Sequence, residues 1–143
     1  MDLVSDALEE LAGAVLYGGL GLLLLTAGYF MLDVMIPGRI GQLLVVQRSR
    51  NVGIIVSSGL LSIGIVVATA LWSAEGDLSD GLAAAAGYGV LGILLLAATF
   101  RVVDMKTPGR LGEIIRDDHD HPVAWVLASA LLAAGLVQAA AIS

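Results

Sequence analysis

Hydrophobic residues in this chain occur in four long, nearly uninterrupted runs rather than in an alternating pattern. The runs extend over about Leu11 to Leu32, Val52 to Trp72, Leu82 to Val103 and Pro122 to Ile142. Each holds the roughly 20 apolar residues that a helix needs to cross the hydrocarbon layer of a bilayer. Because lipid cannot satisfy backbone hydrogen bonds, continuous runs predict helices rather than the alternating strands of a barrel. The pattern therefore predicts an all-α membrane protein with four transmembrane helices.

The first two runs and the last two are related by an internal repeat. The segment DVMIPGRIG, which begins at Asp33, returns as DMKTPGRLG, which begins at Asp104, an offset of 71 residues. Further matches at this offset are Tyr17 with Tyr88, Gly18 with Gly89, Ser58 with Ser129 and Gly64 with Gly135. We infer two duplicated helical hairpins. Each hairpin has an even number of spans, so both run in the same direction, and we expect a pseudo-two-fold axis along the membrane normal.

The repeat divides the chain into four segments. They are an acidic N-terminal segment over residues 1–10, a first two-span repeat over 11–72, an acidic linker over 73–81 and a second two-span repeat over 82–143.

Within each repeat a Pro-Gly pair ends the first span, at Pro37-Gly38 and at Pro108-Gly109. Proline disfavours a helical residue before it and suits a first helical position, so Thr107 is the expected N-cap of a short helix beginning at Pro108. Apolar residues at helical spacing follow both pairs. They predict short amphipathic helices at the inner membrane interface, with the apolar faces Ile40, Leu43, Leu44 and Leu111, Ile114, Ile115.

Composition and charge add an orientation. Hydrophobic residues make up 58% of the chain and charged residues 14%, with a mean hydropathy of +0.93. The net charge of −6 conceals a segregation of signs, because the N-terminus and the linker are purely acidic. All seven basic residues lie in or beside the Pro-Gly segments: Arg39, Arg48, Arg50, Arg101, Lys106, Arg110 and Arg116. Basic flanks remain in the cytoplasm. We therefore expect an inner or plasma membrane protein with cytoplasmic Pro-Gly segments and both termini outside, and no secretory signal.

Three features together resemble the DUF350 family of small bacterial and archaeal inner-membrane proteins. They are the Asp-x-x-x-Pro-Gly ending of the first span, Asn51 at the start of the second span, and the duplication. The resemblance covers roughly Leu11 to the C-terminus. Pro122 stands where a second Asn51 would stand, so a role of that asparagine is not duplicated. The resemblance implies no established activity, and it implies an envelope-stress or polyamine connection only through neighbouring genes.

Asp33 and Asp104 are the first candidates for chemistry, because a carboxylate at the end of a membrane span is costly in lipid. In one interpretation each aspartate forms a structural corner, accepts hydrogen bonds from the following turn, and pairs with Arg39 or Arg110. In the alternative, the two carboxylates approach one another and form a proton or cation site. Arg101, three residues before Asp104, is either its ion-pair partner or a snorkelling arginine.

The strip Asp117-Asp118-His119-Asp120-His121 is dense in oxygen and imidazole groups. We interpret it as a solvated loop. The alternative is a site for a divalent metal or a pH sensor that uses Asp118, His119, Asp120 and His121. Within the spans, serine and threonine hydroxyls are expected to bond to their own backbone or to line a polar path, and Gln138 requires a buried partner.

Other chemistry is not indicated. The chain has no cysteine, and it lacks a nucleophile–base set, a P-loop, a dinucleotide fingerprint and a basic nucleic-acid patch. We expect no enzymatic activity, no cofactor and no nucleic-acid partner.

Two functional hypotheses follow from the sequence. The first is a non-enzymatic membrane module that supports envelope integrity or stress response. Its small-residue helix faces favour a homo-oligomer, and its basic segments would contact anionic lipid or a cytoplasmic protein. The alternative is a small oligomeric channel or transporter for protons, cations or polyamines that uses Asp33 and Asp104.

Overall fold

The computed structural model describes residues 2–74, 76–117 and 120–143, which contain helices and no strand. The helices are α1 (Asp2–Met35), α2 (Ile40–Val45), α3 (Arg50–Trp72), α4 (Leu78–Lys106), α5 (Leu111–Asp117) and α6 (Val123–Ile142). Within these ranges α1, α3, α4 and α6 are long and apolar enough to cross a membrane. The predicted all-α fold with four transmembrane helices is therefore confirmed.

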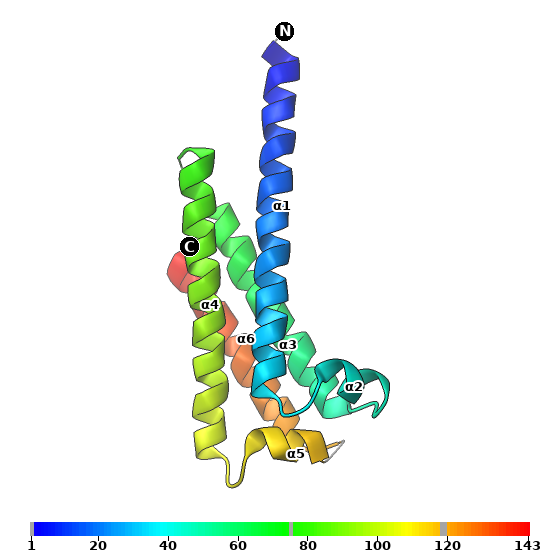
Figure 1. The fold of residues 1–143 in the computed structure, drawn as a ribbon. Coiled ribbons are helices and arrows are strands. Elements are labelled where there is room, and N and C mark those ends of the chain that lie inside the picture. Colours follow the sequence, from blue (N-terminus) through cyan, green and yellow to red (C-terminus); the bar gives the residue numbers. More distant parts are fainter. Residues whose placement is uncertain (1, 75, 118–119) are drawn as a thin grey trace.

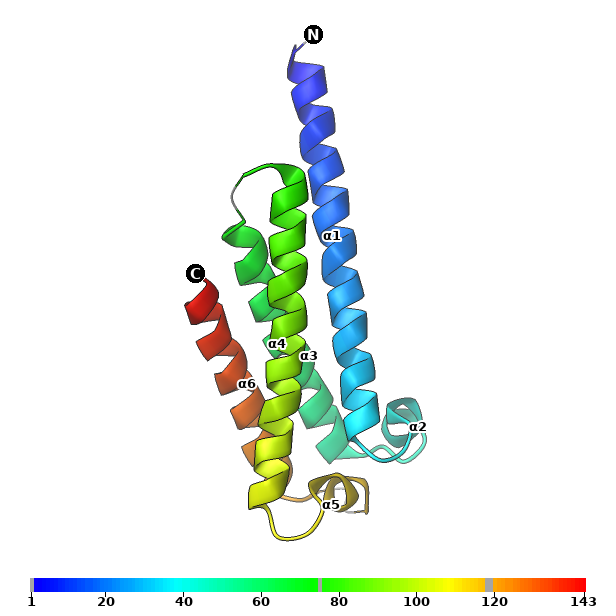
Figure 2. The ribbon, with the colours of Figure 1, turned by 60° about the vertical axis from the view of Figure 1, so that its left-hand side comes forward.

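Two of the long helices begin before their apolar runs. α1 starts at Asp2 and includes most of the acidic segment over residues 1–10, and its 34 residues give a length of about 51 Å. α4 starts at Leu78, inside the predicted linker, with Asp80 in its first turn. Acidic residues stabilise the positive end of a helix dipole, so polar first turns extend both helices. As a result, α1 projects past the other long helices at the end opposite α2 and α5 (Figures 1 and 2).

The Pro-Gly pairs form turns rather than helix starts. α5 begins at Leu111 and not at Pro108, and Thr107 is the C-cap of α4, with its hydroxyl donating to a carbonyl one turn earlier at 2.8 Å. Gly38 and Gly109 have φ angles of 106° and 90°, a region that glycine enters without steric cost. The predicted N-cap was wrong because the chain must reverse direction before α5 can start. Both short helices lie at the same end of the bundle (Figure 1).

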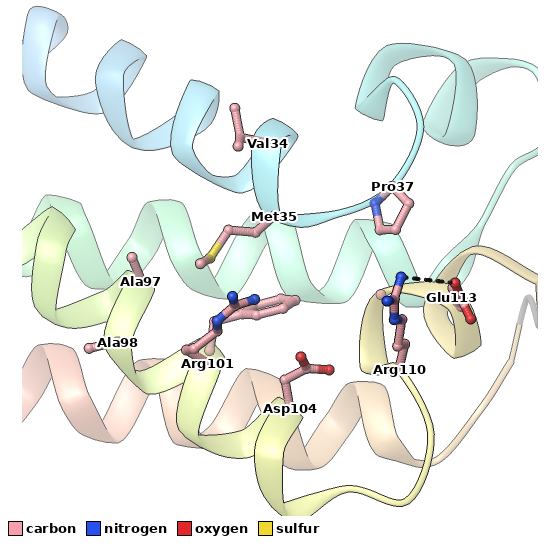
Figure 3. Close-up of a pocket in the computed structure, with 11 residues that line it drawn as sticks. Val34, Met35, Pro37, Ala97, Ala98, Arg101, Asp104, Arg110 and Glu113 are labelled. Atoms are coloured by element: carbon pink, nitrogen blue, oxygen red, sulfur yellow. Dashed lines mark ion pairs between the residues drawn. The ribbon is translucent and has the colours of Figure 1, made fainter.

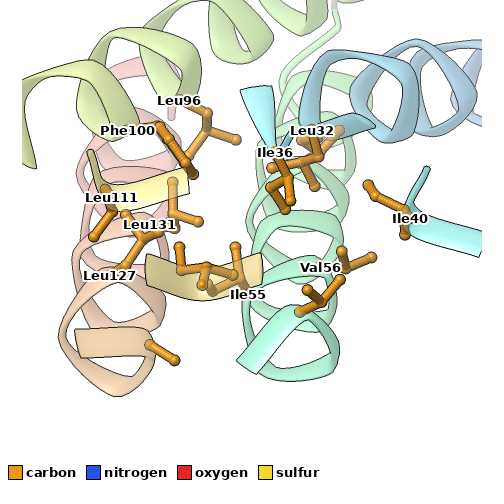
Figure 4. Packing of buried hydrophobic residues seen from close by; sticks show 14 of the residues in the cluster. Leu32, Ile36, Ile40, Ile55, Val56, Leu96, Phe100, Leu111, Leu127 and Leu131 are labelled. Carbon is orange, nitrogen blue, oxygen red and sulfur yellow. The ribbon is translucent and has the colours of Figure 1, made fainter. Parts of the chain in front are cut away.

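α3 is the central helix of the bundle. It packs against α1, α4 and α6, and its contact with α6 is the most extensive in the molecule, whereas α1 and α6 hardly touch. The hydrophobic core includes buried residues of α2 and α5 together with residues of the long helices (Figure 4). Its fully buried side chains come from all six helices and include Leu32, Ile36, Ile40, Ile55, Leu96, Leu111, Ile115, Leu127 and Leu131.

Small residues bring the backbones of α3 and α6 together. A Cβ atom on Gly135 would lie 2.7 Å from Ser62 Cβ and 2.9 Å from Ser62 Cα. The buried Ser62 hydroxyl lies 2.7 Å from the Leu131 carbonyl oxygen of α6 and 2.9 Å from the Ser58 carbonyl oxygen of its own helix. Close backbone approach of this kind is the usual basis of helix association in lipid.

The contacts between the two halves do not follow the predicted two-fold axis. Gly135 packs against Ser62, whereas a Cβ on Gly64, the residue 71 positions before Gly135, would meet nothing within 4 Å. Gly89 likewise packs against a leucine of α1, whereas nothing lies within 4 Å of a Cβ on its counterpart Gly18. A two-fold relation would give both members of each pair the same surroundings. The halves therefore meet head to tail, through two different surfaces.

Candidate functional site

A cleft with a volume of about 790 Å³ opens where the ends of α1 and α4 meet α5 (Figure 3). Its charged lining residues are Arg101 and Asp104 on α4, Arg110 just before α5, and Glu113 within α5. Its remaining walls are mostly apolar side chains of α1 and α4. Charged groups beside a membrane span are costly unless they face water or partners, so this cleft is the candidate functional site.

Asp33 and Asp104 form equivalent corners at this end of the bundle. Asp33 Oδ1 accepts a hydrogen bond from the backbone N–H of Ile40 at 2.8 Å, and Asp104 Oδ1 accepts one from the N–H of Leu111 at 2.7 Å. These amides begin α2 and α5 and have no partner within their own helices. Ile40 and Leu111 are both completely buried, so water cannot satisfy them. Each carboxylate therefore acts as a cap for the short helix that follows it.

The expected ion pairs between these aspartates and nearby arginines are absent from the described part of the chain. Arg110 Nη1 lies 3.7 Å from Glu113 Oε1 instead (Figure 3). Neither Arg39 nor Arg101 has an ion-pair partner among the described residues. The reason is geometric: each carboxylate turns toward the amide that it caps, while the arginine side chains extend to the surface.

At the α2/α5 end, more basic than acidic side chains are left without a partner among the described residues. Three acidic side chains there form ion pairs, Glu113 with Arg110 at 3.7 Å, Asp117 with Arg116 at 2.9 Å and Asp120 with Arg50 at 3.8 Å. The hydrogen bond and charge of Asp117 raise the pKa of the Arg116 guanidinium above its ordinary value. Across residues 2–74, 76–117 and 120–143, four basic side chains have no ion pair, and all four are exposed: Arg39, Arg48, Arg101 and Lys106.

Asn51 links the first half of the chain to the second. Its side chain is 1% exposed, and its Oδ1 accepts a hydrogen bond from the His121 backbone N–H at 3.0 Å. His121 Nδ1 in turn accepts from the Val123 N–H, at the start of α6, at 3.2 Å. Asn51 thus holds the segment that enters α6, in which Pro122 occupies the position equivalent to its own.

The metal-site hypothesis for the acidic strip gains no support from the described residues. Asp120 pairs with Arg50, and His121 has the capping role given above. Asp118 and His119 lie outside the described residues. Within the described ranges, no group of three or more histidine, cysteine or acidic side chains is placed to hold a metal ion.

Polar residues within the spans divide into two kinds. Ser58, Ser62 and Thr69 hydroxyls bond to carbonyls of their own helix at 2.9 Å, as predicted. Gln138 Oε1 is buried and has no hydrogen-bond partner among the described residues. It lies against Gly92, where a Cβ would come within 3.2 Å of it.

The four spans agree with comparisons to known proteins. The family model described as Domain of Unknown Function (DUF350) matches residues 6–142. The chain belongs to the DUF350 family.

Relatives of this DUF350 chain include UPF0719 transmembrane proteins of mycobacteria. The protein of Mycolicibacterium paratuberculosis is 29% identical over 140 residues, which cover 98% of this chain and 93% of the relative. Those of Mycobacterium bovis and Mycobacterium tuberculosis are each 30% identical over 140 residues, covering 98% of this chain and 92% of the relative. No solved structure matches this chain significantly. A multi-pass membrane protein is therefore supported by the relatives and by the helices alike.

The charged cleft itself was not predicted from the DUF350 sequence pattern. Arg101 and Glu113 stand at positions where the first repeat has Phe30 and Gln42. Both are departures from the repeat, and both line the cleft together with Arg110. Positions at which the duplicated halves differ in charge were therefore the signal in the sequence that would have located this site.

Proposed function

We propose that this DUF350 protein is a non-enzymatic, homo-oligomeric membrane module of the cell envelope whose α2/α5 end binds anionic lipid headgroups. One observation carries the proposal: the acidic side chains described at that end act as caps or form ion pairs, whereas four exposed cations there form no ion pair with any described residue. A cation close to an anionic bilayer surface gains about 1 kcal/mol. Anionic phosphate is thus the complementary partner.

The shape of the cleft supports the same proposal. Arg101 and Arg110 line a cleft whose other walls include Val34, Met35 and Ala97. A guanidinium matches a phosphate group with two parallel hydrogen bonds, and the apolar walls suit the start of an acyl chain. Under the predicted topology, this end faces the cytoplasmic leaflet, where anionic headgroups are available.

The transport alternative is less well supported by the geometry. It requires Asp33 and Asp104 to exchange protons or cations, but each carboxylate caps a buried amide. A cation that displaced the amide from Oδ1 would leave that amide unsatisfied at a cost of about 1–3 kcal/mol. A structural role requires only the hydrogen bonds that the two carboxylates already accept.

The proposal is tested by retention of phosphatidylglycerol on the purified protein, measured by native mass spectrometry from nanodiscs of mixed phosphatidylglycerol and phosphatidylcholine. We expect R101Q/K106Q to weaken retention about 30-fold, because two contacts of about 1 kcal/mol each are lost. The matched control is R50Q/R116Q, which removes the same charge from arginines that already form ion pairs. Equal retention by the two double variants would refute headgroup binding.

A flux assay separates the module from the transporter. In liposomes containing the native protein we expect no proton or polyamine flux above that of protein-free vesicles. Flux that is abolished in D33N/D104N would replace the module proposal with transport, since asparagine keeps an acceptor oxygen for the cap but cannot titrate.

A further inference from the structure

We infer that copies of this protein associate head to tail, with the glycine face of α1 in one copy packed against the α4–α6 face around Leu95 of the next. The inference does not depend on headgroup binding. It follows from how the two halves of a single chain already meet.

Within the chain, the first half supplies side chains and the second half supplies glycines. Each glycine is so close to its partner that a Cβ atom there would overlap it. The pairs are Leu24 with Gly89, Tyr17 with Gly81 and Val66 with Gly92. Small residues that receive larger side chains are a common mode of helix association in lipid.

Much of both surfaces recurs 71 residues away, at the outer edges of the molecule, although Glu10 stands at the position equivalent to Gly81. Leu24 is 5% exposed and its counterpart Leu95 is 42% exposed; Val66 is 1% exposed and its counterpart Val137 is 69% exposed. On the glycine side, the counterpart of the buried Gly89 is Gly18, which has nothing within 4 Å of a Cβ position. One unused copy of each surface is therefore present.

The Pro-Gly turns show the same difference between a glycine that is covered and an equivalent glycine that is not. Pro37 of the first Pro-Gly turn packs against Gly112 of α5, where a Cβ would lie 3.0 Å or less from two atoms of the proline ring. Gly41, the counterpart of Gly112 in α2, has nothing within 4 Å of a Cβ position. The unfilled contacts therefore extend from the spans to the end of the bundle.

A buried polar atom marks the same outer surface. Gln138 occupies the position equivalent to Val67, which is 5% exposed in the first half. In the second half, Gln138 lines a small cavity of about 160 Å³ with Tyr88 and Leu95, and its Oε1 has no partner among the described residues. Gln138 therefore places a polar side chain beside Leu95, on the face that the proposed contact would cover.

An interface between two different surfaces continues from copy to copy. Heterologous contacts close into a ring or extend as an open chain, whereas an isologous contact stops at a dimer. Inside one chain, the glycine face of α4 receives side chains of the first half. In a second copy, the equivalent glycine face of α1 would receive the equivalent side chains of α4 and α6. The partner proposed is accordingly another copy of this protein.

Cysteine cross-linking in membranes tests the arrangement, since the native chain has no cysteine. G18C and L95C, carried on differently tagged chains and expressed together, should form a cross-linked pair bearing both tags with a short bis-maleimide. Neither variant expressed alone should cross-link, and the double variant G18C/L95C should give a ladder of oligomers. Both positions are exposed, so folding is not expected to suffer.

The control is L24C/G89C, whose cysteines replace the corresponding contact inside one chain and should cross-link without any increase in mass. Cross-linking of G18C to itself would overturn the head-to-tail arrangement in favour of a symmetric dimer. Absence of the mixed pair while the control cross-links would show that lipid covers this face. As an independent measurement, G18L should reduce the oligomer mass in mild detergent with no loss of helical circular dichroism.

Discussion

Substitution of Gly135 by alanine tests the contact between α3 and α6 most directly. The new Cβ would lie 2.7 Å from Ser62 Cβ and 2.9 Å from Ser62 Cα, and a backbone atom cannot move aside as the tip of a side chain can. Since carbon atoms pack at about 3.5–4.0 Å, the helices must separate by about 1 Å. The matched control is Gly64→Ala, because Gly64 is the counterpart of Gly135 and has open space around it.

The magnitude follows from three contributions. Overpacking at a well-packed contact costs about 1–3 kcal/mol. A 1 Å separation also breaks the hydrogen bond from the Ser62 hydroxyl to the Leu131 carbonyl, now 2.7 Å long, at about 1 kcal/mol. Replacing a mid-helix glycine by alanine stabilises the helix by about 1 kcal/mol at either position. We therefore expect Gly135→Ala to be less stable than Gly64→Ala by about 2–4 kcal/mol, because the helix-propensity gain cancels between them.

The assay is reversible unfolding by SDS in mixed micelles, followed by far-ultraviolet circular dichroism, at a dilution where the chain is monomeric. Monomeric conditions matter because the proposed contact between copies involves the exposed glycine face of the first half. Equal unfolding midpoints for the two variants would refute the claim that α3 and α6 depend on close backbone approach at Gly135.

Three further predictions concern the α2/α5 end. Asp104→Ala should reduce the free energy of unfolding by about 1–3 kcal/mol because it leaves the buried first amide of α5 unsatisfied; Asp104→Asn should recover most of this loss, and equal losses would argue against a cap. Gly112→Ala should destabilise the chain by about 1–3 kcal/mol because its Cβ meets the ring of Pro37, while Gly41→Ala should be neutral or slightly stabilising in the monomer; the same unfolding assay compares them. Asn51→Leu should lose the hydrogen bond to the backbone of the segment before α6 and speed hydrogen exchange there, and unchanged exchange would contradict its linking role.

The sequence by itself determined the number of spans and their approximate bounds, and it offered the corner as one of two interpretations of Asp33 and Asp104. Span length is a local property, since it depends only on a run of apolar residues and on the thickness of the bilayer. The corner is also local, because Asp33 and the amide that it caps are seven residues apart. Helix ends were less predictable: polar first turns lengthened α1 and α4, and Thr107 caps the end of α4 rather than the start of α5.

Tertiary structure alone decided how the duplicated halves meet. Both halves carry equivalent glycines, such as Gly18 and Gly89, and local sequence gives no reason to prefer either one as the contact inside the chain. Only the packing of complete helices shows that Gly89 is covered and Gly18 is not. The charged cleft has the same origin, because Arg101 and Glu113 come from different helices and meet only once α4 and α5 have packed against the end of α1. Local hydrogen bonds and span lengths can be read along a chain, but a choice between two equivalent surfaces depends on the packing of the whole molecule.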